Sequence, residues 1–226
     1  MKWLEDIKQF LLPTYCLSCK HPLANKTELF CVSCYDELPR TQHFENKYND
    51  CYLHINTEEL PLEYAATLFY FKKDSVLKNS VHLLKYKHKT DVGYFFGIQL
   101  GRQAVNVECF LYADYILPLP LHKNKRKIRG YNQSDFIARG VQSILKLPIV
   151  DKTVIRIKET KSQTKMNKME RELNMQNAFK WIKEYPEGTH FIVIDDVVTT
   201  GASIKSLMQS SKRKYRFSIL CIGLSE

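Results

Sequence analysis

Four consecutive apolar residues, Phe191-Ile192-Val193-Ile194, run directly into two adjacent acids, Asp195 and Asp196. A continuous apolar run of this length predicts a strand that is buried on both faces, as in a parallel sheet. We expect the strand to stop at the two acids, which then lie at its carboxyl end, where open α/β sheets bind ligands. Carboxylates in that place can accept hydrogen bonds from neighbouring sugar hydroxyls.

The segment after the acids is expected to bind a phosphate. It contains two threonines and a glycine, and a helical pattern begins at Ser203. A glycine lets backbone N–H groups approach a ligand closely, and a helix start offers N–H donors and the positive end of a dipole. Together with the acids, the run therefore predicts a site for ribose 5-phosphate. The alternative is a strand that leads into an ordinary capped helix, with the acids in a solvated loop.

Two cysteine pairs lie near the N-terminus and are separated by eleven residues: Cys16, Cys19, Cys31 and Cys34. Four thiolates at this spacing predict one closed, tetrahedral, structural zinc site. His21 could replace one thiolate, and two disulfides are the competing interpretation. Disulfides need an oxidising compartment, whereas the charged start of the chain lacks the apolar core of a signal peptide, so a cytoplasmic protein is expected. The other cysteines have no partner at ligand spacing and are expected to be buried or partly buried: Cys51, Cys109 and Cys221.

The chain carries a formal net charge of +10 at pH 7, which predicts attraction to polyphosphates or nucleic acid. Its cations cluster in three groups: Lys123, Lys125, Arg126, Lys127 and Arg129; Lys158, Lys161, Lys165, Lys168 and Arg171; and Lys212, Arg213, Lys214 and Arg216. We expect the first group in a proline-bounded loop after a strand, where a pyrophosphate could bind. A solvated cationic surface is the alternative for each group.

Strand patterns alternate with helical patterns along most of the chain. Strands are expected at 64–71, 114–117, 154–157 and 217–222, and helices at 76–84, 92–105 and 132–146. This alternation predicts an α/β fold with a mainly parallel sheet flanked by helices. We expect a zinc-finger segment and linker at 1–61 and the main domain at 62–226. No apolar run is long enough to cross a bilayer.

The run from Ile192 to Ser203 resembles the motif with which type I phosphoribosyltransferases bind phosphoribosyl pyrophosphate (PRPP). The resemblance implies that Asp195 and Asp196 contact the ribose hydroxyls and act in catalysis. It also implies that the following loop surrounds the 5-phosphate, through Val198, Thr199, Thr200, Gly201, Ala202 and Ser203.

Further segments resemble the ComF family. They are the Pro-x-Pro-Leu-His element at 118–122, Arg129-Gly130-Tyr131-Asn132-Gln133, the Lys85-Tyr86 pair, the four cysteines, and Thr160, Gln163, Glu170-Arg171, Asn174 and Ala178-Phe179. The resemblance covers essentially the whole chain. It implies a type I phosphoribosyltransferase-like domain with an N-terminal zinc finger, linked to DNA uptake in natural transformation, with single-stranded DNA and the DNA-uptake helicase machinery as partners.

If such a protein is an enzyme, a nitrogen nucleophile displaces pyrophosphate from C1 of PRPP. The acids would hold the ribose and a hydrated Mg²⁺, and cations would bind the leaving pyrophosphate. The expected pyrophosphate ligands are Arg126 and Arg129, with Lys165 or Arg171 closing over the site. The alternatives are a PRPP-sensing nucleic-acid-binding protein without turnover, and a phosphoribosyltransferase with an unknown acceptor outside competence.

Overall fold

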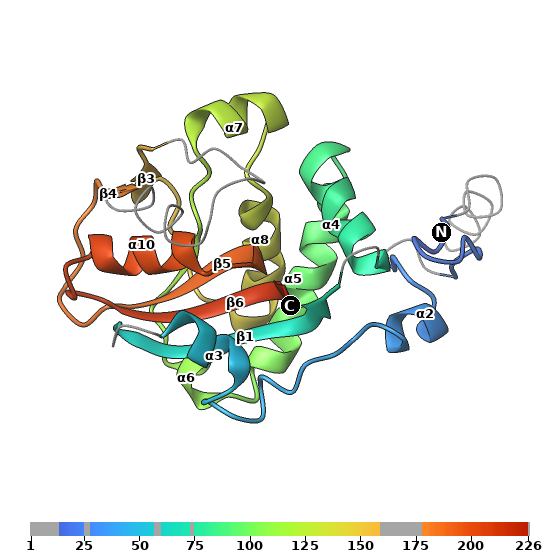
Figure 1. The fold of residues 1–226 in the computed structure, drawn as a ribbon, viewed down its shortest axis with the longest axis horizontal. Coiled ribbons are helices and arrows are strands. Elements are labelled where there is room, and N and C mark those ends of the chain that lie inside the picture. The colour runs from blue at the N-terminus through green and yellow to red at the C-terminus, as the bar shows by residue number, and fades with distance from the viewer. Residues whose placement is uncertain (1–13, 25–27, 57–59, 73–74, 159–177, 226) are drawn as a thin grey trace.

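The centre of the fold is a four-stranded parallel sheet, seen in a computed structural model of the chain (Figure 1). The structure describes residues 14–24, 28–56, 60–72, 75–158 and 178–225. The strands follow the order β1–β6–β5–β2, with β1 at Leu62–Phe71, β2 at Tyr115–Pro118, β5 at His190–Val198 and β6 at Arg216–Ser225. Each neighbouring pair is parallel, so the predicted α/β class is confirmed.

Strand β5 is longer than the sequence predicted. Its first part is fully buried, from Phe191 to Ile194, as expected. The strand does not stop at the acids, however, because Asp195 and Val198 still pair with Cys221 and Leu224 of β6. Since β6 runs on to Ser225, it offers hydrogen-bond partners to the backbone of β5 beyond the apolar run. Both acids therefore belong to the last part of the strand.

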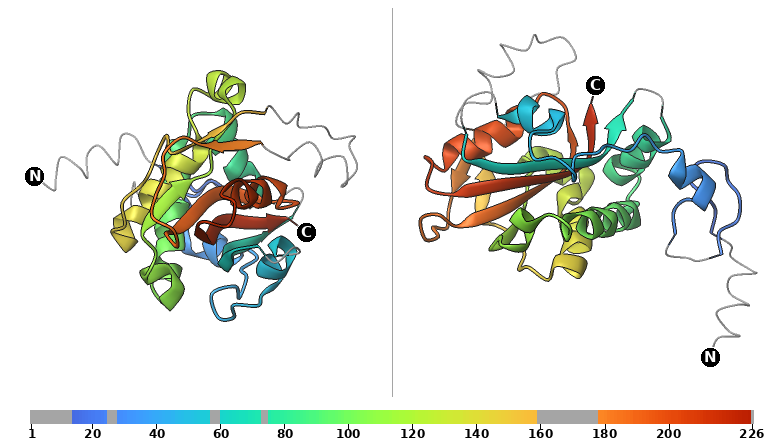
Figure 2. Two further views of the ribbon diagram at one scale, coloured as in Figure 1. Left: turned by 90° about the vertical axis from the view of Figure 1, so that its left-hand side faces the viewer. Right: turned by 90° about the horizontal axis from the view of Figure 1, so that it is seen from below.

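Helices cover both faces of the sheet (Figure 2). One face packs against α4 (Val76–Tyr86), α5 (Thr90–Ala104) and α8 (Gln133–Leu145), all three of which the sequence predicted. The other face packs against α3 (Asp50–Ile55), α10 (Ala202–Ser210) and an antiparallel pair formed by β3 (Val154–Arg156) and β4 (Phe179–Trp181). The predicted helix after Ser203 is confirmed as α10, whereas α3 and β4 were not predicted.

Helices α5 and α8 approach each other backbone to backbone at two glycines. A Cβ at Gly97 would lie 2.1 Å from the carbonyl oxygen of Ile137, and a Cβ at Gly140 would lie 2.3 Å from that of Tyr94. No other residue type fits at such distances without moving a helix. This contact holds α8 in place, and the first turn of α8 contributes to the site described below.

The first basic group forms a short helix, α7 (Lys123–Arg129), where the sequence analysis expected a loop. The Nδ1 atom of His122 accepts the N–H of Asn124 at the start of the helix. At its end, Gly130 adopts a left-handed conformation with φ of 79° and donates its N–H to the carbonyl of Arg126. Both ends of α7 are therefore capped, which explains why a segment of cations is helical.

The N-terminal segment extends past the carboxyl end of β1, beside α4 (Figure 1). It contains α2 (Val32–Asp36), and a further short helix, α6 (Glu108–Leu111), precedes β2. Phe30 is buried, and its ring centroid lies 6.0 Å from those of both Phe95 and Phe96 of α5. The division into 1–61 and 62–226 stays a prediction. Among the described residues, no helix has both the length and the apolar character that crossing a membrane requires.

Candidate functional site

The two acids at the end of β5 are held by different elements. Asp195 accepts the hydroxyl of Ser134, from the first turn of α8, at 3.2 Å, and the N–H of Asp196 at 2.9 Å. Asp196 accepts the N–H of Val197 at 2.7 Å, and its Oδ2 lies 2.9 Å from the ammonium of Lys85, near the end of α4. Asp196 is only 4% exposed, so the alternative of a solvated loop is wrong.

The electrostatics of the two acids differ. Burial and the neighbouring carboxylate of Asp196 raise the pKa of Asp195 from 3.8 to about 7. Burial also acts against the charge of Lys85, but the ion pair with Asp196 outweighs it and raises the pKa of Lys85. Asp196 is thus paired with Lys85, whereas Asp195 is an acid whose ionisation the fold resists.

A small cavity of about 50 Å³ lies between Asp195 and the start of α10, and Asp196 does not line it. The loop that lines it contains every residue that the sequence assigned to the phosphate: Val198, Thr199, Thr200, Gly201, Ala202 and Ser203. Gly201 adopts a left-handed conformation with φ of 68° and forms the N-cap of α10. The ring of His54 from α3 makes a hydrogen bond of 2.8 Å to the carbonyl oxygen of Thr199. The loop between β5 and α10 is therefore held in place by a side chain from a distant part of the sequence.

We expect Gly201→Ala to lower stability because alanine is strained at a positive φ. The added methyl group would meet only ordinary contacts, the nearest being Ile55 Cγ1 at 3.5 Å, so the cost is conformational. A left-handed alanine costs about 1–2 kcal/mol, which corresponds to a fall in Tm of roughly 2–8 °C for a chain of this size. Asparagine tolerates this conformation better, so Gly201→Asn should melt closer to wild type. If calorimetry gives the same Tm for Gly201→Ala and wild type, the left-handed conformation of residue 201 is contradicted.

The predicted pyrophosphate ligands lie on two sides of α7. Arg129 donates to the side-chain oxygen of Gln133 at 2.9 Å and stacks over the ring of Tyr86. The positive charge of Arg129 also acts to lower the pKa of Lys85. Arg126 instead lines a second cavity, between α7 and β3. Lys165 and Arg171 lie outside the described residues.

Three side chains near the acids were not assigned a role from the sequence: Ser134, His54 and Arg156. Arg156, at the end of β3, donates to the hydroxyl of Ser203 at 3.5 Å, and burial lowers its pKa although Asp195 acts in the other direction. The sequence contained one sign that Arg156 could have a role, because Arg156 is a charged residue at the end of a short apolar strand. Nothing local marks Ser134 or His54, because each reaches the site from a distant part of the sequence. Lys85 was noted only as part of a motif.

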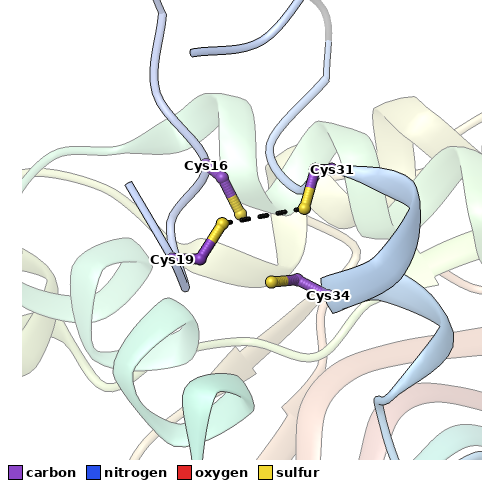
Figure 3. Close-up of side chains that lie close together, drawn as sticks. All are labelled: Cys16, Cys19, Cys31 and Cys34. Atoms are coloured by element: carbon purple, nitrogen blue, oxygen red, sulfur yellow. Dashed lines mark hydrogen bonds between the residues drawn. The ribbon is translucent and has the colours of Figure 1, made fainter. Parts of the chain in front are cut away.

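The four N-terminal cysteines form a cluster with metal-binding geometry. Their sulfur atoms all lie within 4.8 Å of one another and turn toward a common centre (Figure 3). The sulfurs of Cys19 and Cys31 are 3.7 Å apart, close to the roughly 3.8 Å expected for two sulfurs about 2.3 Å from a tetrahedral zinc ion. All seven cysteines lie in the described residues and are free, so the disulfide alternative is not what the structure shows. His21 is exposed and is not part of the cluster.

The three remaining cysteines agree with their predicted environment. Cys51 and Cys221 are fully buried, and Cys109 is partly buried, with its sulfur 3.3 Å from the hydroxyl of Ser218. Burial raises the pKa of Cys51 to about 12, so its thiol stays protonated at neutral pH. These cysteines therefore pack as small hydrophobic residues.

Comparison with known proteins gives relatives of modest identity. No family model matches the chain. The chain is 32% identical over 97 residues to competence protein F of Haemophilus influenzae, covering 42% of each protein. It is 25% identical over 192 residues to competence protein ComFC of Bacillus subtilis, covering 84% of this chain and 74% of that protein. These similarities support membership of the ComF family at modest identity.

A further relative is DNA utilization protein YhgH of Salmonella typhimurium. It is 27% identical over 136 residues, and the match covers 57% of this chain and 58% of YhgH. The chain thus spans somewhat more than half the length of YhgH and less than half that of competence protein F. Within it, the family element at 129–133 connects α7 to α8, and most of the element at 160–179 lies outside the described residues.

Proposed function

We propose that this ComF-family protein binds PRPP at the carboxyl end of β5. The observation that carries the proposal is that a buried carboxylate, Asp196, and a partly buried one, Asp195, adjoin a glycine-containing cavity at a helix start. In this arrangement Asp195 and Asp196 hold the ribose hydroxyls, and the Val198–Ser203 loop holds the 5-phosphate. The N–H groups at the start of α10 and its dipole favour an anion there.

The raised pKa of Asp195 supports the same proposal. An acid that the fold holds against ionisation lowers stability at neutral pH, so its presence calls for a role outside folding. A ligand that donates hydroxyl groups, or a cation bound with it, gives the carboxylate the partners that the fold withholds. PRPP with Mg²⁺ supplies both.

Arg129 is the better placed of the two proposed pyrophosphate ligands on α7. Its charge acts on Lys85, which in turn is paired with Asp196, so Arg129 lies near the ribose side of the site. A guanidinium can hold two phosphate oxygens at once. We keep Arg126, Lys165 and Arg171 as proposed ligands that would approach the pyrophosphate from other segments.

Carboxylate oxygens of Asp195 and Asp196 are donors of the type that Mg²⁺ prefers. A bound Mg²⁺ would neutralise charge on the pyrophosphate. The chain itself would orient the ribose, hold the 5-phosphate and place cations on the leaving group, so that a nitrogen nucleophile can displace pyrophosphate from C1. The same binding without an acceptor would make the site a PRPP sensor, and an assay for pyrophosphate release separates the two roles.

Calorimetric titration with PRPP and Mg²⁺ tests the proposal. Wild type should bind, and Asp195→Asn should bind about 10- to 100-fold more weakly, because one charge-assisted hydrogen bond contributes about 1.5–3 kcal/mol. Asp91→Asn, an acid-to-amide change on the exposed side of α5, is the matched control and should bind like wild type. Equal affinity of Asp195→Asn and wild type would refute the ribose site.

Single-stranded DNA is the second candidate ligand, and α7 is the observation that favours it. This exposed helix carries five cations, and the neighbouring Tyr86 is 54% exposed beneath Arg129. Cations with an exposed ring are suited to phosphate contacts and base stacking. The named relatives are competence and DNA utilization proteins, and we propose a role in DNA uptake and use for this chain too. The PRPP titration should therefore be repeated with single-stranded DNA present, where a changed affinity would couple the two ligands.

We also propose that the four-cysteine cluster holds one structural zinc ion. With four protein sulfurs, no coordination position is open for water, so the metal would stabilise the segment and take no part in catalysis. Free thiolate ligands persist in a reducing compartment, which fits a cytoplasmic protein.

A further inference from the structure

One peptide of the Val198–Ser203 loop, the phosphate loop of the proposed PRPP site, is held by a side chain from outside the cavity. Nε2 of His54, in α3, lies 2.8 Å from the carbonyl oxygen of Thr199, and His54 is not among the residues that line the cavity. A carbonyl oxygen can only accept a hydrogen bond, so Nε2 of His54 carries the hydrogen and donates it. The carbonyl of Thr199 is therefore turned toward α3.

The direction of this carbonyl fixes the direction of the next N–H group. The peptide that joins Thr199 to Thr200 is trans, and in a planar trans peptide the C=O and N–H bonds point in opposite directions. With its carbonyl bound by His54, this peptide points the N–H of Thr200 away from α3. Thr200 lines the cavity, so a phosphate bound there can accept this N–H. The reversed peptide would present a carbonyl oxygen, which repels a phosphate.

Helix α3 is a fixed support for His54. Asn49, the N-cap of α3, accepts the N–H of Tyr52 at 2.9 Å and donates to the carbonyl oxygen of Ala65, in β1, at 2.9 Å. Ile55, which follows His54, is fully buried. Because α3 is held to the sheet at both ends, it can place the His54 ring more accurately than a loop could.

A histidine in the last turn of a helix has an ordinary alternative role, since its positive charge interacts favourably with the helix dipole. That role requires a charge but no particular partner. His54 makes its hydrogen bond to one backbone carbonyl that lies 145 residues further along the chain. Its ring also lies beside Gly201, with Cδ2 3.9 Å from the position that a Cβ at Gly201 would take. Two contacts with one loop favour a role in placing that loop.

We propose that His54 is a positioning residue of the phosphate site, because it turns the N–H of Thr200 toward the 5-phosphate. This role rests on the proposed function, the binding of PRPP. It also assigns part of the site to residues 1–61, the portion of the chain that carries the four clustered cysteines.

Calorimetric titration of the full zinc-loaded chain tests this role, with ribose 5-phosphate and with PRPP and Mg²⁺ as ligands. His54→Leu removes the donor and should weaken binding of both ligands about tenfold or more, as expected for the loss of one hydrogen bond to a charged group. His54→Gln has a similar reach and keeps an N–H donor, so it should bind both ligands nearly as tightly as wild type. Leu53→Gln changes an exposed side chain on the same helix and should have no effect.

Amide NMR separates a positioning role from a merely structural one. In wild type, ribose 5-phosphate should shift the N–H signal of Thr200 downfield, because the N–H gains a phosphate acceptor. This shift should be lost in His54→Leu and restored in His54→Gln. His54→Ala removes the ring without adding apolar surface and should behave like His54→Leu, so the test does not depend on the fold tolerating leucine.

The role of His54 is overturned, and PRPP binding stands, if wild type binds PRPP and the leucine and alanine variants bind it as tightly. It is also overturned if His54→Gln binds as weakly as His54→Leu, since the donor would then be irrelevant. If wild type binds neither ligand, the proposed function falls and the role of His54 falls with it.

Discussion

Removing zinc from the four-cysteine cluster should lower Tm by about 10 °C or more. The segment buries Leu23, Leu29 and Phe30, and Phe30 contacts the aromatic residues of α5. Burial of three such side chains contributes about 4–9 kcal/mol, at roughly 1.5–3 kcal/mol each, and a chain of this size loses about 2–4 °C per kcal/mol. Without the metal a segment this short lacks the contacts to stay folded.

Calorimetry with and without a zinc chelator measures this effect, and elemental analysis should give one zinc per chain. Cys31→Ser should reproduce the loss of stability and of metal. Cys109→Ser is the matched control, because Cys109 is a partly buried thiol outside the cluster. A chain that contains no metal and melts at the same temperature with chelator would exclude a structural zinc.

Replacing the two acids of β5 one at a time should change stability in opposite directions at pH 8. Asp195→Asn should stabilise the protein by on the order of 1 kcal/mol or more, since burial and the neighbouring carboxylate of Asp196 raise the pKa of Asp195 to about 7 and so penalise its charged form at pH 8. The amide can still accept hydrogen bonds from Ser134 and from the N–H of Asp196. Asp196→Asn should destabilise by about 1–3 kcal/mol, because Lys85 is left largely buried and without its counter-charge.

The pH dependence follows from the directions of the two shifts. The folded state binds the proton of Asp195 more tightly than the unfolded state, so stability falls as pH rises from about 4 to about 7. The advantage of Asp195→Asn should therefore shrink between pH 8 and pH 5. Lys85 has a raised pKa, so its contribution is present below its ordinary value of 10.5 and is complete at pH 8.

Urea denaturation at pH 5 and pH 8 provides the measurement, with Asp91→Asn as an exposed control that should lower stability by no more than about 1 kcal/mol, because Asp91 lies in the first turn of α5. If both single variants shift stability in the same direction, the two acids do not have the different environments described above. Since Asp195→Asn is expected to be more stable than wild type, any loss of PRPP binding in this variant cannot come from unfolding.

Local patterns in the sequence predicted most of the regular elements. The apolar run of β5 and the periodic helices α4, α5 and α8 were correct because burial of a strand or of a helix face leaves a local signature. The extension of β5 through Asp195 to Val198 was missed because it depends on the length of its partner strand. Helix α7 was missed because its run of charges resembles a solvated loop, whereas its helical state depends on the caps His122 and Gly130.

The candidate site was predictable where it is continuous in sequence. The acids and the phosphate loop form one run, and the structure places Asp195 and the loop around one cavity, with Asp196 next to Asp195 and paired with Lys85. Lys85, Ser134 and His54 reach that run from other elements, and no spacing rule connects residues so far apart.

Phosphorus NMR of PRPP tests the central claim most directly, because the 5-phosphate and the pyrophosphate give separate signals. With Mg²⁺ and wild-type protein, the 5-phosphate signal should shift on binding, and ribose 5-phosphate should compete for the same site. That result would agree with a 5-phosphate held by the Val198–Ser203 loop. A shift confined to the pyrophosphate signals, or no shift at all, would contradict the account, because PRPP would then meet only the basic surface.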